Sequence, residues 1–333
     1  MNKLAILAGA MAFAAITSAS PVLAEERLVF ANPSPQQMPL NADFLAPWVD
    51  AINAEGAGVL HIDLRFGSPI VNDTNVPDRL LDDVVQIGMQ VTVFSGNRFP
   101  RTLVATLPFL TESGEQASAA LWDVYEKGGF DAELQDFVVL MFGQFPQTAL
   151  HMNGHPVSAL ADIAGRQVVA GNASAVAVAQ HLGATPLSFT IADQYQALQR
   201  GAAAGTMAPF TALPAFRLDE VTTDHLIVPL GGAPVITFMA RERFEALSPE
   251  AQALLMRHGG RAGSIRLGQF LDRWDAGVIA MIAATPGHTV SRSTEAENAE
   301  LAAFAAERIY PQWTSTVPDG QATLDMFRAA LRD

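Results

Sequence analysis

The seven histidines are the side chains of this sequence best suited to acid–base catalysis or metal binding near neutral pH. No two of them recur at i and i+4 on an expected helix, a spacing that is typical of metal-binding helices. His151 and His155 flank a short stretch that contains a glycine, and they could meet in a loop. A metal site or a general base would need such a meeting, but ordinary loop histidines are the favoured interpretation.

Other reactive groups are equally sparse. The sequence contains no G-x-S-x-G, no H-E-x-x-H, no G-x-G-x-x-G and no P-loop motif. It has no cysteine, which excludes disulfides, thiolate metal sites and a cysteine nucleophile. We therefore predict no catalytic residue, no metal ligand and no cofactor.

Composition narrows the class of partner. The chain has 333 residues, half of them apolar, which is enough for one large or two medium cores. The formal net charge is −14, so a basic surface for nucleic acid or for anionic lipid is not expected. A small molecule is the remaining kind of ligand that a chain of this composition would bind through a cleft.

The first 24 residues have the pattern of a secretory signal peptide. Lys3 supplies a positive start, an apolar run follows over residues 4–16, and small residues end the segment at Ala24. We expect cleavage after Ala24 and export of the mature chain, to the periplasm in a Gram-negative cell. An uncleaved membrane anchor is the alternative, although the apolar run is too short for a stable span.

Residues 165–210 show the clearest alternation of strands and helices. Strands are expected at 167–170, 186–189 and 206–210, with a helix between each pair. Asn172 or Ser174 would cap the first helix, and Thr190 or Asp193 would begin the second. Short helices between strands indicate crossovers in a mainly parallel sheet, where ligands bind beyond the carboxyl ends of the strands.

A long helical pattern extends from Ser248 to about residue 284. Ser248 is its cap, Pro249 occupies its first position, and glycines at 259, 260 and 263 weaken it and predict a kink. Extended segments at 145–153 and 234–240 are candidates for crossings between two lobes.

An ordered series of short motifs resembles the DctP-type solute-binding proteins of TRAP (tripartite ATP-independent periplasmic) transporters. The motifs are LPFL at 107–110, ADIAG at 161–165, LGATP at 182–186, DQYQALQRG at 193–201, GTMAP at 205–209 and LSPE at 247–250. The resemblance covers nearly all of the mature chain, and the order of the motifs is more specific than any one of them.

This resemblance implies a fold and a division into lobes. The expected class is α/β, a two-lobed periplasmic-binding-protein fold (type II-like) with interleaved lobes, mixed sheets and a long linking helix. Lobe I would comprise residues 25–147 and about 235–258, and lobe II residues 148–234 and about 270–333. The lobes would close on a ligand by bending at the crossing segments and the long helix.

The resemblance also implies ligand-lining positions. These are Asn32, Gln90, Thr148, Val169, Ala208 and Phe210. Most relatives carry an arginine that binds the substrate carboxylate at the position of Val169, a second arginine near Thr148, and an asparagine at Ala208. Here small or apolar residues stand at the first and third of these positions and a neutral threonine at the second, so the usual charged contacts are missing.

A buried carboxylate without a partner is very costly, which predicts a different ligand chemistry. We expect a more apolar pocket with walls from Val169, Met207, Phe210 and Trp122, and a ligand that is neutral, aromatic or amine-bearing. The alternative is that these residues are ordinary core and that Arg98, Arg101 or Arg166 supplies the charge from another direction.

The function predicted from these observations is extracytoplasmic capture of a small organic solute and its delivery to a TRAP membrane permease, with the protein a monomer and not an enzyme. Two other functions stay open: a secreted α/β hydrolase, for which no nucleophile–base pair can be assembled, and a ligand sensor that feeds a membrane receptor. The C-terminal helix expected at 322–332 could also exchange with a partner chain.

Overall fold

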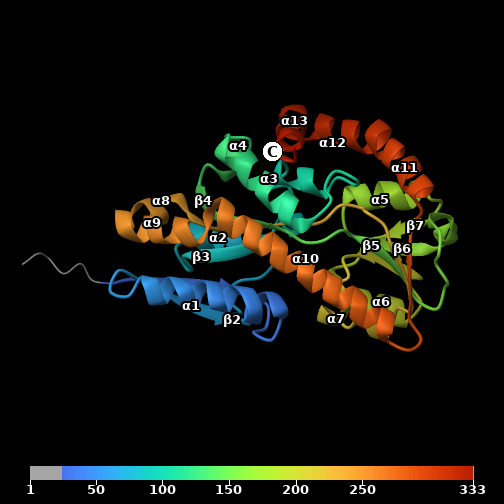
Figure 1. Ribbon diagram of the computed structural model, residues 1–333, viewed down its shortest axis with the longest axis horizontal. Coiled ribbons are helices and arrows are strands. Elements are labelled where there is room, and N and C mark those ends of the chain that lie inside the picture. Colours follow the sequence, from blue (N-terminus) through green and yellow to red (C-terminus); the bar gives the residue numbers. More distant parts are fainter. Residues whose placement is uncertain (1–24, 333) are drawn as a thin grey trace, which may run out of the picture.

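The computed structural model describes residues 25–332, which form two β-sheets surrounded by helices (Figure 1). The first sheet has the order β2(Leu60–Phe66), β1(Glu26–Asn32), β3(Ile87–Val91), β10(Pro234–Ala240), β4(Phe137–Gln144). The second has the order β11(Thr289–Arg292), β9(Asp224–Ile227), β5(Ala149–Met152), β8(Gly205–Ala208), β6(Gln167–Ala170), β7(Thr185–Leu187). Both sheets mix parallel and antiparallel pairs, which confirms the predicted α/β class with two mixed sheets.

Helices cover both sheets. Those that follow lobe I strands are α1(Ala46–Glu55), α2(Val76–Leu81), α3(Gly114–Glu126), α4(Asp131–Leu134), α8(Arg241–Glu245) and α9(Pro249–His258). Those among the lobe II strands are α5(Ala173–His181), α6(Ile191–Gln199) and α7(Ala212–Ala215). The chain ends with α10(Gly260–Ala284), α11(Glu295–Phe304), α12(Tyr310–Thr316) and α13(Gly320–Ala330). No helix within residues 25–332 is long and apolar enough to span a bilayer. The predicted signal peptide lies outside the described residues.

In each sheet, the ends of several strands lie together at one edge, where the chain crosses to the other sheet. We call this edge the crossing edge. In lobe I, β1, β2 and β3 are parallel and β4 has the same direction, so the carboxyl ends at Asn32, Phe66, Val91 and Gln144 share one edge. In lobe II, β6, β7, β8 and β9 likewise end together, beside the first residue of β5. The chain passes between the sheets at these two edges, so they are joined directly.

Two segments, residues 145–148 and 228–233, make this passage. They are hydrogen-bonded to each other, because the Phe145 N–H donates to Ala233 O (2.9 Å) and the Thr148 N–H donates to Gly231 O (2.8 Å). Gly231 has φ +85°, and a Cβ there would lie 2.1 Å from Thr106 O. A side chain at this position would therefore strain the backbone and collide with lobe I.

The long helical pattern is present and broken, as predicted. The Ser248 hydroxyl accepts from the Ala251 N–H (3.3 Å), and Pro249 begins α9. The break falls at Gly259, where a Cβ would lie 2.2 Å from Leu140 O in β4. The close approach of helix and strand thus requires glycine at the point where α9 gives way to α10.

α10 extends along both lobes (Figure 1). Its first half packs on α3 and β4, and near its end Val278 and Ile282 join a lobe II cluster with Val169 and Phe210. Trp274 contacts Phe145 of the crossing segment, with ring centroids 6.5 Å apart. The helix therefore braces the passage between the lobes.

The C-terminal helices also bridge the lobes. α11 begins beside lobe II, where the Leu160 N–H donates to Glu297 Oε1 (2.8 Å), and Phe304 stacks on His181. α13, which was expected with lobe II, packs on α3, and its end is held by the Gln116 amide donating to Leu331 O (3.1 Å). Leu324 and Phe327 of α13 lie in the same core cluster as Leu121 of α3, which buries the apolar face of this last helix.

Candidate functional site

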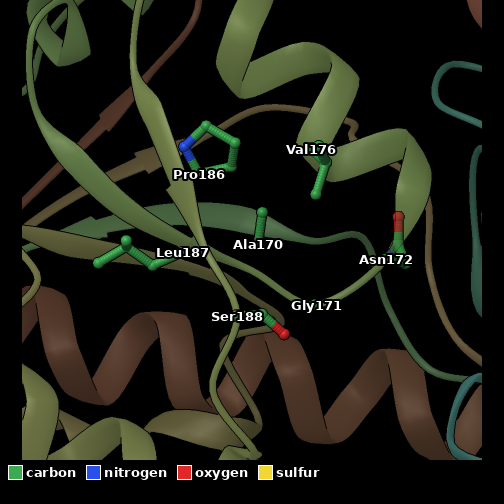
Figure 2. A pocket seen from close by; sticks show the side chains of 7 residues that line it. All are labelled: Ala170, Gly171, Asn172, Val176, Pro186, Leu187 and Ser188. Carbon is green, nitrogen blue, oxygen red and sulfur yellow. The ribbon is translucent and has the colours of Figure 1, made fainter.

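A pocket of about 300 Å³ opens at the crossing edge of lobe II (Figure 2). It is lined by Ala170, Gly171, Asn172, Val176, Pro186, Leu187 and Ser188. These residues are the last ones of β6 and β7, the residues that directly follow these strands, and Val176 in the first turn of α5. A pocket in this place is what open α/β sheets provide for ligands.

The lining is neutral, and local structure fixes it. The Asn172 side chain caps α5 by accepting from the Ala175 N–H (2.9 Å), so its position is set by the helix. No atom lies within 4 Å of the position that a Cβ would occupy at Gly171, so no side chain covers the floor of the pocket at this residue. None of the seven lining residues carries a charge. The pocket can therefore contact a ligand through apolar surface, backbone groups and the Ser188 hydroxyl.

The structure brings the predicted lobe II residues together directly beneath this pocket. Val169 and Phe210 lie in one buried cluster, and Met207 is paired with the pocket residue Ala170. All are nearly inaccessible, with Val169 at 0% and Met207 at 5% exposure. The accessible residues, Gly171 and Ser188 among them, were missed because the predicted set followed single strand positions and not the neighbouring strand ends.

The predicted lobe I residues lie at the crossing edge of that lobe. The Asn32 amide donates to Asn41 Oδ1 (3.1 Å), and its oxygen accepts from the Ser34 N–H (2.8 Å), so both groups serve the loop after β1. The Gln90 amide donates to Asp73 O (2.6 Å). Thr148 is half-buried and is held through its backbone by the other crossing segment.

Two amide oxygens at this edge accept no hydrogen bond from any residue in the described range. They belong to Gln90 and to Gln144, and both side chains are 1% exposed. The Gln144 amide nitrogen donates to Ala105 O (3.1 Å), whereas its oxygen has no partner among the described residues. Buried acceptors without a partner are costly and favour a donor brought from outside.

The structure does not bring Arg98, Arg101 or Trp122 to the pocket. The Arg98 guanidinium pairs with Asp78 and lies on the ring of Phe137, at the end of β4 opposite the crossing edge. The Arg101 guanidinium pairs with Asp319 in the loop before α13. Trp122 is buried at 3% exposure in the core between α3 and β4, where its ring contacts Phe142.

Three of the six most exposed large apolar side chains in the described chain lie beside the crossing edges. The large apolar residues most exposed within the described chain are Ile70, Leu81, Val84, Phe94, Phe189 and Met281. Ile70 follows β2 and Phe94 follows β3 in lobe I, and Phe189 follows β7 in lobe II. Half of this set therefore lies in the loops that border the passage between the lobes.

Two titratable groups near the passage have strongly shifted pKa values. Burial raises the pKa of the Asp275 carboxyl on α10 to about 7, and one of its oxygens has no partner among the described residues. Its other contact is with the backbone N–H of Thr211, which follows Phe210. Burial also lowers the pKa of His151 to about 3.

His151 is not a loop histidine, and the favoured interpretation of this residue was wrong. It lies in β5, and its ring contacts His225 and not His155. No group of three His, Cys, Asp or Glu side chains in residues 25–332 has the arrangement of a metal site.

Comparison with known proteins identifies the family. The family model for bacterial extracellular solute-binding proteins of family 7, named DctP, matches residues 30–315. A TRAP solute-binding protein from a marine metagenome, specific for aromatic acid ligands and solved with 3-hydroxybenzoate, is 24% identical with a TM-score of 0.84, covering 93% of this chain and 99% of that one.

Two further solved structures share the fold. A TRAP solute-binding protein from Rhodoferax ferrireducens with copurified benzoate is 22% identical, with a TM-score of 0.83 over 92% of this chain and 97% of that one. One from Bordetella bronchiseptica with bound mandelate is 24% identical, with a TM-score of 0.78 over 92% of this chain and 98% of that one. The chain belongs to the DctP family of bacterial extracellular solute-binding proteins, as its ordered motifs and its two joined sheets had indicated.

Proposed function

We propose that this protein captures a small organic solute between its two lobes in the periplasm and delivers it to the membrane permease of a TRAP transporter. The observation that carries the proposal is that the crossing edges of both sheets meet at one passage. Each lobe contributes its strand ends to that passage, and the pocket at Ala170–Asn172 opens there. No covalent chemistry is needed for this function.

The connection between the lobes suits a closing motion. Within residues 25–332 the chain passes between the sheets through the two crossing segments and the helices α10 to α13, and Gly231 and Gly232 lie within one of these segments. Bending at a few such residues would bring the two edges together around a solute. A solute that contacts both edges would favour the closed form, which the permease would then recognise.

We further propose that the solute is neutral, aromatic or amine-bearing and is not a simple carboxylate in the usual pose of the family. The neutral pocket lining supports this, because a buried carboxylate needs a cationic or hydrogen-bonded partner. The free oxygens of Gln90 and Gln144 favour a ligand that donates hydrogen bonds. Phe94 and Phe189 would supply aromatic surface, and relatives of the same fold bind aromatic acids.

In this proposal the two lobes have different roles. Lobe I would orient the solute through Gln90, with Asn32 holding the loop after β1 in place. Thr148 of the crossing segment would add a polar contact, and lobe II would enclose the solute with the residues around Ala170 and Ser188. Val169, Met207, Ala208 and Phe210 would support that wall from beneath, and Trp122 would stabilise the core of lobe I.

A thermal-shift screen over acids, amines, aromatic and neutral solutes tests the capture function, since a bound ligand raises the unfolding temperature by mass action. We expect stabilisation by at least one aromatic or amine-bearing solute, together with a smaller radius of gyration in X-ray scattering. Stabilisation by aliphatic monocarboxylates alone would contradict the ligand class, and a hit without compaction would contradict closure.

The arginines provide a second test. Arg98→Ala and Arg101→Ala should leave the affinity for the best solute unchanged within about twofold, because their guanidinium groups are paired away from the pocket. A tenfold loss in either variant would show that an arginine reaches the solute. Uptake by vesicles that contain the cognate permease would then separate transport from sensing.

A further inference from the structure

Three histidines form a continuous hydrogen-bonded chain across lobe II. His151 Nε2 lies 3.0 Å from Ala208 O at the crossing edge, and His151 Nδ1 lies 2.9 Å from His225 Nδ1. His225 Nε2 lies 3.0 Å from Nδ1 of His288, which is half-buried just before β11. His151 and His225 are 0% exposed, so the chain leads from solvent to the end of β8 through the interior.

The carbonyl at the inner end fixes every proton in the neutral chain. Ala208 O can only accept, so His151 Nε2 must carry a proton and its Nδ1 must accept. His225 Nδ1 must then donate to His151, which leaves His225 Nε2 as the acceptor for His288 Nδ1–H. The outer Nε2 of His288 is the one ring nitrogen of the three that carries neither a proton nor a bond within the chain.

This arrangement accepts one additional proton and no more. The three shared positions each hold a single proton, and the only free position is the outer nitrogen of His288. A proton that enters there charges His288, and two proton shifts along the existing bonds move the charge to His151 without rotating a ring. A second added proton would place two donors against each other and break a bond.

The surroundings favour a neutral chain in the absence of an added proton. Burial lowers the pKa of His225 to about 4 and that of His151 to about 3, with the neighbouring rings acting in the same direction. The carboxylate of Asp224 on β9 opposes this shift, and hydroxyls of Thr223 and Thr289 bind it. Val278 and Ile282 of α10 pack in one apolar cluster with Phe210, whose ring contacts His151, and Asp275 of α10 accepts from the Thr211 N–H next to Phe210.

We propose that His288, His225 and His151 form a one-proton relay that connects solvent with the crossing edge of lobe II. The charge that it carries inward would lie beside Ala208 and Phe210, whose ring contacts His151 at 4.8 Å between centroids. On the proposed function, an anionic solute in the passage would therefore bind with uptake of up to one proton, which the relay would carry inward. A neutral or cationic solute would leave the chain neutral and would bind without proton exchange.

Nitrogen-15 NMR of the imidazole rings in the full mature chain tests the relay without any solute. At about pH 7.5 we expect His151 in the Nε2–H form and both His225 and His288 in the Nδ1–H form. On acidification through about pH 4, near the lowered pKa of His225, the three rings should shift with one shared midpoint. A His151 ring in the Nδ1–H form, or three unrelated midpoints, would overturn the proposal.

A matched pair of variants separates a relay from simple packing. His288→Asn keeps an amide donor at the position of Nδ1 but cannot take up the proton, so it should preserve the tautomers of His151 and His225 and abolish their response to pH. His61→Asn in lobe I should leave that response intact. A persistent response in His288→Asn, or ring signals that move on addition of EDTA, would contradict a proton relay.

Calorimetry with benzoate and benzylamine as probes, in buffers of different ionisation enthalpy, then tests the coupling to solute. We expect up to one proton taken up with benzoate, no proton exchange with benzylamine, and no uptake with benzoate in His288→Asn. Benzoate binding without proton uptake in the wild type, or proton release on binding of benzylamine, would overturn the coupling. If neither probe binds, the passage does not accept these charged aromatic solutes, and the NMR result still decides the relay.

Discussion

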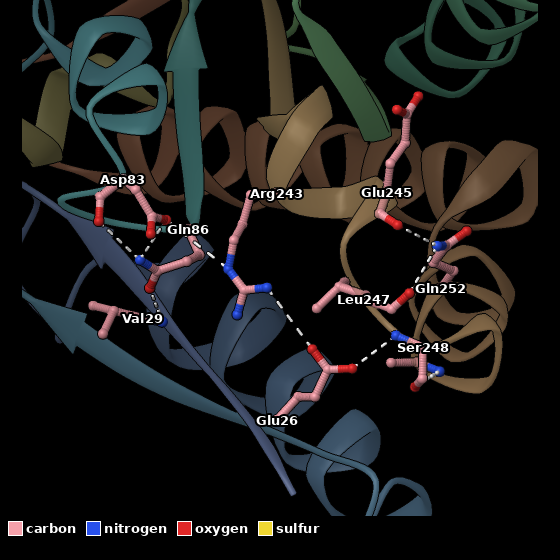
Figure 3. Close-up of polar contacts among 10 residues, drawn as sticks. Glu26, Val29, Asp83, Gln86, Arg243, Glu245, Leu247, Ser248 and Gln252 are labelled. Carbon is pink, nitrogen blue, oxygen red and sulfur yellow. Dashed lines mark hydrogen bonds and ion pairs between the residues drawn. The ribbon is translucent and has the colours of Figure 1, made fainter. Parts of the chain in front are cut away.

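Two edges of the molecule use polar side chains in opposite ways. We call the region around Glu26, at the start of β1, and Asp83, Arg243 and Ser248 the outer edge of lobe I. Charged side chains there form ion pairs with one another and hydrogen bonds with backbone groups (Figure 3). Glu26 accepts from the Ser248 N–H (2.7 Å) and lies 3.8 Å from Arg243, which also approaches Asp83 at 3.9 Å. At the crossing edge of lobe II, the pocket is lined by seven neutral residues.

The absence of charged residues from the lobe II pocket is not explained by a shortage of charged residues in the chain. The chain has 34 acidic and 20 basic residues, yet Arg98 and Arg101 pair with carboxylates far from the pocket. Ion pairs at exposed edges contribute little to stability but tolerate water, whereas an apolar edge binds ligand surface. The comparison supports our proposal that the crossing edge of lobe II contacts a neutral or aromatic group of the solute.

The largest effect should come from the passage itself. Gly231→Ala should lower the free energy of unfolding by about 4 kcal/mol, because the residue has φ +85° and the new Cβ would overlap Thr106 O. Urea unfolding measures this. Gly277→Ala on α10, where nothing lies within 4 Å of the Cβ position, should be neutral or slightly stabilising. Equal stability of both variants would show that the passage is not held as described.

The next effect concerns the buried carboxyl of Asp275 beside the passage, which has no cationic partner among the described residues that would offset its burial. The pKa of Asp275 is raised to about 7, so its folded state favours the neutral form, and stability falls as pH rises from about 4 to 7. Asp275→Asn removes this loss and should stabilise the protein by about 3 kcal/mol near pH 8 and little near pH 4.

The neighbouring Asp272 is the matched control. Its carboxylate accepts from the Gly114 and Glu115 N–H groups (2.7 and 2.9 Å) at the start of α3. Asp272→Asn should therefore destabilise by about 1 kcal/mol near pH 8. A stabilising Asp272→Asn, or a gain in Asp275→Asn that does not depend on pH, would contradict this account.

A third variant tests the pocket. Gly171→Leu should fill the floor and weaken binding of the best solute by at least about tenfold, with the unfolding free energy changed by less than about 0.5 kcal/mol. Gly277→Leu controls for the added apolar surface. Unchanged affinity in Gly171→Leu would place the solute elsewhere.

The smallest effect is expected at the outer edge of lobe I. Arg243→Gln should cost at most about 1 kcal/mol, because both of its ion pairs are long and partly exposed. Solute affinity should not change. A loss of affinity would mean that the two edges are coupled, which the structure gives no reason to expect.

Local signals in the sequence predicted the elements well. The cap at Asn172, the start at Ser248 and the break near Gly259 all follow from residues within a few positions of the feature. The partners of Arg98 and Arg101 could not be predicted in this way, since Asp319 is 218 residues from Arg101. The same applies to the chain from His151 through His225 to His288, which depends on how β5, β9 and β11 pair.

The pocket could be predicted from the sequence only in part. The motif at 161–165 and the position of Val169 pointed to the end of β6, where the pocket lies, but the pocket is also lined by Leu187 at the end of β7 and by Ser188 after it. Side-chain direction alternates along a strand, so a one-residue step from Val169 to Ala170 changes a buried residue into a lining one. Strand pairing was needed to see this.

The most direct test of a neutral capture site is the affinity for benzamide relative to benzoate, measured by calorimetry on one preparation near pH 8. The two probes have the same ring and differ in charge and in hydrogen-bond donors. Our account predicts that benzamide binds at least as tightly as benzoate. Benzoate binding at least about tenfold tighter than benzamide would contradict it.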